Sequence, residues 1–87
     1  MPGRFESFEE LYNDLLTGHE YEFYYNDKEY SIDSHCEISE EKRTYYVCFP
    51  DNAVSEFNSV DELLDGFIVD GKSFREFVFD VDVRIEF

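Results

Sequence analysis

Carboxylates are the side chains with the greatest chemical potential in this sequence, which holds 22 Asp and Glu residues but only seven Lys and Arg. The formal net charge is −15 at pH 7. Two stretches, residues 5–27 and 44–71, contain acids and not one Lys or Arg. Grouped carboxylates can perform acid–base chemistry or bind arginine guanidinium groups. The candidates for such a role are Glu10 and Asp14 in the first stretch, and Asp51, Glu56, Asp61, Glu62, Asp65 and Asp70 in the second.

Catalytic chemistry has little support in the residue pattern. With so many acids, a carboxylate pair at the separation that glycosidases use would arise by chance. His35 and Cys36 are adjacent, and neighbouring strand residues point to opposite faces, so they cannot share a proton as a nucleophilic pair does. The sequence has no glycine-rich phosphate loop, no paired-cysteine motif and no calcium-binding loop. We therefore expect no enzyme, no cofactor and no metal.

Like charges occur where solubility alone would favour mixed signs. Glu10 and Asp14 lie one helical turn apart, as do Asp61 and Asp65, and neither pair has a counterion nearby in sequence. Each like-charge pair destabilises its helix by a few tenths of a kcal/mol. A Lys four residues after the first acid would instead stabilise the helix by a similar amount. The helix dipole favours acids in first turns but does not explain Asp14 or Asp65. This placement favours an acidic surface that binds a partner, although net negative charge also aids solubility by itself.

The final strand repeats the acidic pattern. Asp80 and Asp82 are expected on one face about 6.6 Å apart, given a rise of ~3.3 Å per residue. Regularly spaced carboxylates on a rigid frame resemble the outline of a phosphate backbone. A protein built to bind DNA would accept such a surface, whereas nucleic acid and anionic membranes would be repelled by it.

Two tyrosines provide a second type of candidate. Tyr12, Tyr21, Tyr25, Tyr30 and Tyr45 follow apolar periodicities and are expected in the core. Tyr24 and Tyr46 are out of phase with that pattern, and tyrosines at exposed strand positions are typical of interfaces. The alternative is that both cover a second apolar layer or a homodimer face.

The elements that must position these residues follow from local patterns. Ser7 with Glu10, and Ser59 with Glu62, have the capping-box spacing that starts a helix, and strict alternation indicates strands elsewhere. The sum is a single α+β domain spanning residues 1–87, with an antiparallel sheet of four to five strands and two or three short helices on one side. The expected helices span about 7–18, 59–66 and 73–77, and the expected strands span 21–25, 28–38, 44–49, 53–57 and 79–87, with a polar turn at 39–43.

The location is expected to be cytoplasmic. The apolar runs are only a few residues long, and no apolar signal core follows the N-terminal residues. Cys36 and Cys48 are expected to be free thiols, because the compartment is reducing and strand parity places Cys36 with Ile32 but Cys48 opposite Val47.

Three segments of the chain carry a resemblance: 21–32 (YEFYYNDKEYSI), 57–66 (FNSVDELLDG) and 68–76 (IVDGKSFRE). They resemble short uncharacterised proteins encoded by phages and mobile elements of Gram-positive bacteria. In size and charge the chain is also similar to acidic anti-CRISPR inhibitors that occupy the DNA-binding groove of a type II effector nuclease. The first resemblance implies a fold more than a function, because it rests on turn and core residues, and the second carries no contact residue over.

The sequence thus leads to the hypothesis of a non-enzymatic DNA mimic that inhibits a basic nucleic-acid-binding protein, with a CRISPR effector nuclease as the foremost candidate. Arginines that read guanine beside the target would instead bind carboxylates. The alternative is a structural or regulatory interaction module of a mobile element, which could form a homodimer through an edge strand. The expected contact residues are Asp51, Glu56, Asp61, Glu62, Asp65, Asp70, Glu10, Asp14, Tyr24 and Tyr46.

Overall fold

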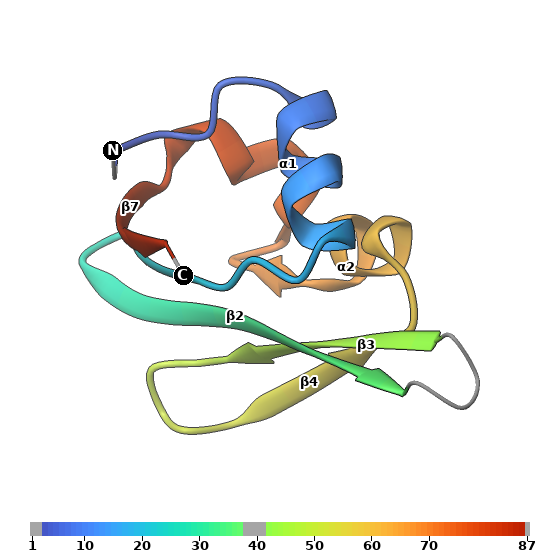
Figure 1. Ribbon diagram of the computed structural model, residues 1–87. Coiled ribbons are helices and arrows are strands. Elements are labelled where there is room, and N and C mark those ends of the chain that lie inside the picture. The colour runs from blue at the N-terminus through green and yellow to red at the C-terminus, as the bar shows by residue number, and fades with distance from the viewer. Residues whose placement is uncertain (1–2, 38–41, 87) are drawn as a thin grey trace.

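The computed structural model describes residues 3–37 and 42–86. Within them, five strands form an antiparallel sheet in the order β4-β3-β2-β1-β7, and β5 pairs with β6 in a separate two-stranded sheet. Three short helices complete the expected α+β fold (Figure 1). The elements are α1 (Phe8–Leu16), β1 (Tyr21–Tyr25), β2 (Lys28–Glu37), β3 (Lys42–Cys48), β4 (Val54–Phe57), α2 (Val60–Gly66), β5 (Ile68–Val69), β6 (Lys72–Ser73), α3 (Phe74–Phe77), the 3₁₀ helix η1 (Val78–Asp80) and β7 (Asp82–Glu86).

Local signals account for the first half of the fold. The Ser7 hydroxyl accepts a hydrogen bond from the Glu10 amide at 3.1 Å and so begins α1 as predicted. Asn26 and Asp27 both have positive φ, 52° and 62°, which is the geometry of the two-residue turn that suits a hairpin. The β1–β2 hairpin is therefore confirmed. The polar turn expected at 39–43 lies mostly outside the described residues, and β3 begins at Lys42.

The core lies between one face of the sheet and the helices. Phe67 is at its centre, with ring centroids 5.2 Å from Phe74, 5.4 Å from Phe49 and 5.5 Å from Phe77. Such aromatic pairs contribute about 0.5–1.5 kcal/mol each beyond the burial of their area. Of the tyrosines expected in the core, three are buried, and the other two are half-buried against it: Tyr21, Tyr30 and Tyr45, then Tyr12 and Tyr25.

The final strand differs from its prediction. Residues 78–80 form η1, so Asp80 is not on a strand and does not share a face with Asp82 at the expected spacing. The β1–β7 register shifts between Glu22 and Phe23, and Glu22 then lies opposite Ile85. This bulge turns Ile85 away from the core and leaves it 41% exposed. Strict alternation in the sequence does not reveal an inserted residue.

The cysteines are free thiols, as expected, with Cys36 exposed and Cys48 half-buried. Cys36 is exposed although it shares strand parity with Ile32, which is buried. In residues 3–37 and 42–86, every helix is too short and too polar to cross a bilayer.

Candidate functional site

A shallow groove of about 550 Å³ between β4 and α2 gathers four of the predicted acids. We call it the acidic groove. All four carboxylate residues are exposed. Its lining comprises Glu56, Phe57, Asn58, Asp61, Glu62, Asp65 and Gly66.

The floor of the acidic groove depends on a glycine. A Cβ placed on Gly66 would lie 2.6 Å from Cε1 of Phe57, closer than side chains pack. The absence of a side chain at Gly66 thus lets the Phe57 ring lie against the last turn of α2. This contact connects the edge strand β4 to the helix that carries three of the acids.

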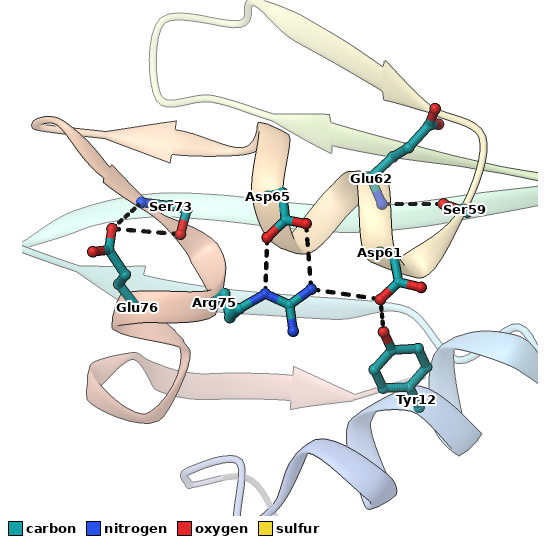
Figure 2. A network of polar contacts seen from close by, with 8 residues as sticks. All are labelled: Tyr12, Ser59, Asp61, Glu62, Asp65, Ser73, Arg75 and Glu76. Atoms are coloured by element: carbon teal, nitrogen blue, oxygen red, sulfur yellow. Dashed lines mark hydrogen bonds and ion pairs between the residues drawn. The ribbon is translucent and has the colours of Figure 1, made fainter.

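The start of α2 orients Glu62. The Ser59 hydroxyl accepts a hydrogen bond from the Glu62 amide at 3.0 Å (Figure 2). The Glu62 carboxylate accepts from the Asn58 amide at 2.7 Å. The predicted cap is therefore present, and the glutamate side chain bonds the residue before the N-cap.

Asp61 and Asp65 have a counterion that is distant in sequence, although neither has one nearby in sequence. Nε of Arg75 in α3 lies 2.8 Å from Oδ1 of Asp65, and Nη2 lies 3.4 Å from Oδ2 of Asp65 and 3.5 Å from Oδ1 of Asp61 (Figure 2). The Tyr12 hydroxyl of α1 also donates to Asp61. The hydrogen bond from Arg75 lowers the pKa of Asp65 and raises that of Arg75. One guanidinium thus joins α2 to α3 and relieves the like-charge pair.

Glu10 and Asp14 lie on a different surface. They line a groove of about 300 Å³ along α1 together with Ser7, Glu9 and Asn13. The Asp14 carboxylate accepts a hydrogen bond from the Tyr21 hydroxyl at 2.9 Å. Asp14 therefore has a structural role that its sequence spacing did not reveal, and this pair does not extend the acidic groove.

Asp51 and Asp70 occupy turns. The Asp51 carboxylate accepts from the Ala53 amide at 3.0 Å, and the Asp70 carboxylate accepts from the Asn26 side chain at 3.3 Å. Burial, followed by the charge of Asp70 and more weakly that of Asp51, raises the pKa of Tyr30. These acids stabilise turns and do not line the acidic groove. The second acidic stretch is therefore divided between two places.

Tyr24 and Tyr46 lie on the face of the sheet opposite the core, which we call the open sheet face. The described helices all pack on the other face (Figure 1). Glu56 of β4, which lines the acidic groove, also lies on the open sheet face. Tyr46 lies opposite Asp33 on one side and Glu56 on the other. The Arg84 guanidinium carbon is 5.0 Å from the centroid of the Tyr24 ring. Both tyrosines are half-buried, not fully exposed.

A second groove on the open sheet face was not predicted. It has a volume of about 670 Å³ and lies beside β1 and β7, where Nε of Arg84 is 3.3 Å from Oδ2 of Asp82. The β7 bulge brings Ile85 into it, so no sequence period could have located it. The groove is lined by Glu22, Phe23, Tyr24, Tyr25, Asn26, Asp27, Glu29, Asp80, Asp82, Arg84 and Ile85.

The described residues contain no group of three or more His, Cys, Asp and Glu side chains arranged to hold a metal ion. His35 and Cys36 are both exposed and follow each other on β2. Comparison with known proteins finds no matching family model, curated protein or solved structure. The fold and grooves define a small acidic α+β protein, and inference about its function rests on its own residues.

Proposed function

We propose that this chain is a non-enzymatic inhibitor that acts in the cytoplasm by occupying the nucleic-acid-binding site of a basic protein. A CRISPR effector nuclease is the first target to test, and a phage or mobile element is the source we infer. The observation that carries the proposal is the acidic groove, where Glu56, Asp61, Glu62 and Asp65 converge on one exposed surface.

The charge of the acidic groove suits an arginine-rich partner. Four carboxylates against the one guanidinium of Arg75 leave it negative. The two-nitrogen contact between Arg75 and Asp65 has the fork geometry with which a carboxylate binds an arginine of another protein. Arginines that contact guanine or phosphate in a nuclease use the same donors.

Association would be fast and dependent on salt. A net charge of −15 steers a basic partner over long distances, and added salt shortens that reach. Phosphate-binding sites are rich in Lys and Arg because each neutralises backbone charge. A carboxylate surface would therefore compete directly with DNA for the same groups.

The test is capture of the partner from bacterial lysate with and without competing duplex DNA. The expected result is recovery of a large basic nuclease that duplex DNA displaces, followed by inhibition of purified nuclease in a DNA-cutting assay. Capture that duplex DNA does not reduce, or full cleavage in the presence of excess protein, would contradict mimicry.

A second candidate is a regulatory interaction module, which the open sheet face favours. Tyr24 and Tyr46 lie there, Ile85 is 41% exposed, and the described helices all pack elsewhere. Amphipathic tyrosines are enriched at protein interfaces. Sedimentation of the purified protein separates the two candidates, because a stable dimer that buries this face would support the module.

A further inference from the structure

The outer edge of β4 is open to another strand. β4 ends the sheet order, and among residues 3–37 and 42–86 only β3 pairs with it (Figure 1). At the opposite end of the sheet, the Val83 amide of β7 donates to the Gly3 carbonyl at 2.5 Å. The N-terminal segment thus covers part of the β7 edge, whereas no described segment covers β4.

The register identifies the backbone groups that face outward from β4. The Phe49 amide donates to the Ala53 carbonyl at 2.8 Å, which makes these residues a hydrogen-bonded pair. Hydrogen-bonded and non-hydrogen-bonded residue pairs alternate in an antiparallel ladder. The backbone of Ser55 therefore forms hydrogen bonds with β3, whereas the backbones of Val54 and Glu56 do not. The amides and carbonyls of Val54 and Glu56 therefore point away from the sheet.

β4 lacks most of the features that protect edge strands. Such strands usually carry lysine, proline or a bulge, whereas β4 reads Val-Ser-Glu-Phe with an unbroken register. The Val54 side chain is 59% exposed. Just beyond, Asp61, Glu62 and Asp65 line the acidic groove with Glu56. An open edge beside a negative groove favours a strand that carries positive charge.

We infer that the open edge of β4 binds an extended, arginine- or lysine-rich segment of the partner as an added strand. The inference rests on the proposed function for the basic character of that partner. Backbone bonds to Val54 and Glu56 supply strand pairing, and alternate basic side chains reach the acidic groove. A second copy of the chain is the less favourable occupant, because it would bring two chains of net charge −15 together.

The test compares two changes at one position. Val54→Pro removes the outward amide and leaves the bonds of Ser55 to β3, and proline is tolerated on edge strands at such positions. Val54→Ala shortens the side chain and keeps the amide. The probe is a synthetic peptide that alternates arginine and valine, and calorimetry measures its affinity. We expect Val54→Pro to weaken binding about tenfold and Val54→Ala to change it far less.

A second measurement does not depend on the proline variant. In the unchanged protein, the peptide should slow hydrogen exchange at the Val54 and Glu56 amides. A peptide of the same sequence with N-methyl groups on alternate residues retains the charge but loses the backbone donors. It should bind weakly and leave exchange at these amides unchanged.

The outcomes separate this inference from the proposed function. Strand addition is overturned if the N-methylated peptide binds as tightly as the unmodified peptide, or if the unmodified peptide does not slow hydrogen exchange at the Val54 and Glu56 amides. Neither result affects inhibition of a nuclease. Failure of the protein to inhibit any nuclease, with the peptide still bound at β4, would overturn only the proposed function. A dimer in sedimentation that Val54→Pro abolishes would make a second copy the occupant and overturn the basic segment.

Discussion

Arg75 binds Asp65 through two nitrogens, at 2.8 and 3.4 Å, and also reaches Asp61 at 3.5 Å. This contact joins α3 to α2 and places one positive charge beside the acidic groove. The groove is therefore a carboxylate surface that already holds a guanidinium. A binding partner must bind these carboxylates together with Arg75 or displace Arg75 from them. The side chain of Arg75 is 41% exposed, and those of Asp61 and Asp65 are 68% and 64% exposed, so the pairing is open to solvent and to competition.

Arg75→Gln should lower the melting temperature modestly near neutral pH. Hydrogen bonding to Arg75 lowers the folded-state pKa of Asp65 below its ordinary 3.8, so the stabilisation is present above pH 3.8 and is lost as pH falls through the folded value. Melting curves of parent and variant should converge in strong acid. Arg75→Lys, which keeps the charge without the fork, should fall between them. A difference that persists at a pH well below 3.8 would show that the effect is packing and not the ion pair.

The parent protein should melt at a higher temperature when salt is added. Its net charge of −15 causes self-repulsion, which salt limits to about 8 Å at physiological ionic strength. Few described acids have a basic partner, so screening removes more repulsion than attraction. Differential scanning calorimetry over a series of sodium chloride concentrations measures this. A melting temperature that does not change would mean that the carboxylates are already compensated.

The parts of the fold that were predicted correctly depend on local rules. Ser7 and Ser59 begin helices because a hydroxyl three residues before a backbone amide can accept a hydrogen bond from it. Asn26 and Asp27 form the hairpin turn because both residues tolerate positive φ. The sequence predicted one cluster of six acids between Asp51 and Asp70, and four of them line the acidic groove. Its convergence depends on how β4 packs against α2, which no local spacing encodes.

The missed features are all non-local. Arg75 is ten residues from Asp65 in sequence, and only the docking of α3 brings them together. Ile85 continues an apolar alternation, but the bulge opposite Glu22 turns it outward. The seven basic residues are the possible counterions in the sequence, and 22 acids outnumber them. The identity of the counterion required the tertiary structure.

Gly66→Ala should destabilise the protein although alanine favours helix. Helix propensity alone would gain up to about 1 kcal/mol. The new Cβ would lie 2.6 Å from Cε1 of Phe57, however, and overpacking of this kind costs roughly 1–3 kcal/mol. Urea denaturation measures the balance. Adding Phe57→Leu should recover part of the lost stability by removing the clashing ring atoms. If Gly66→Ala alone were as stable as the parent, the Phe57 ring would be free to move away from the new Cβ.

Neutralising Glu56 and Glu62 tests the acidic groove while preserving its structure. Glu56→Gln leaves the β4 backbone intact, and Glu62→Gln keeps an oxygen that can accept from the Asn58 amide. Asp61 and Asp65 are unchanged, so Arg75 keeps its partners. The double variant should fold normally by circular dichroism and lose inhibition in a DNA-cutting assay, because each partner arginine left unpaired costs on the order of 2–5 kcal/mol, or tenfold and more in affinity.

The matched control for this double variant removes two carboxylates elsewhere. Asp27→Asn with Asp80→Asn changes the net charge equally, and both positions line the groove beside β1 and β7. Asparagine also tolerates the φ of 62° at position 27. If steering by net charge were all that mattered, both double variants would lose the same inhibition. A selective loss with Glu56 and Glu62 locates the contact in the acidic groove, and full inhibition by that variant would exclude the groove as the contact surface.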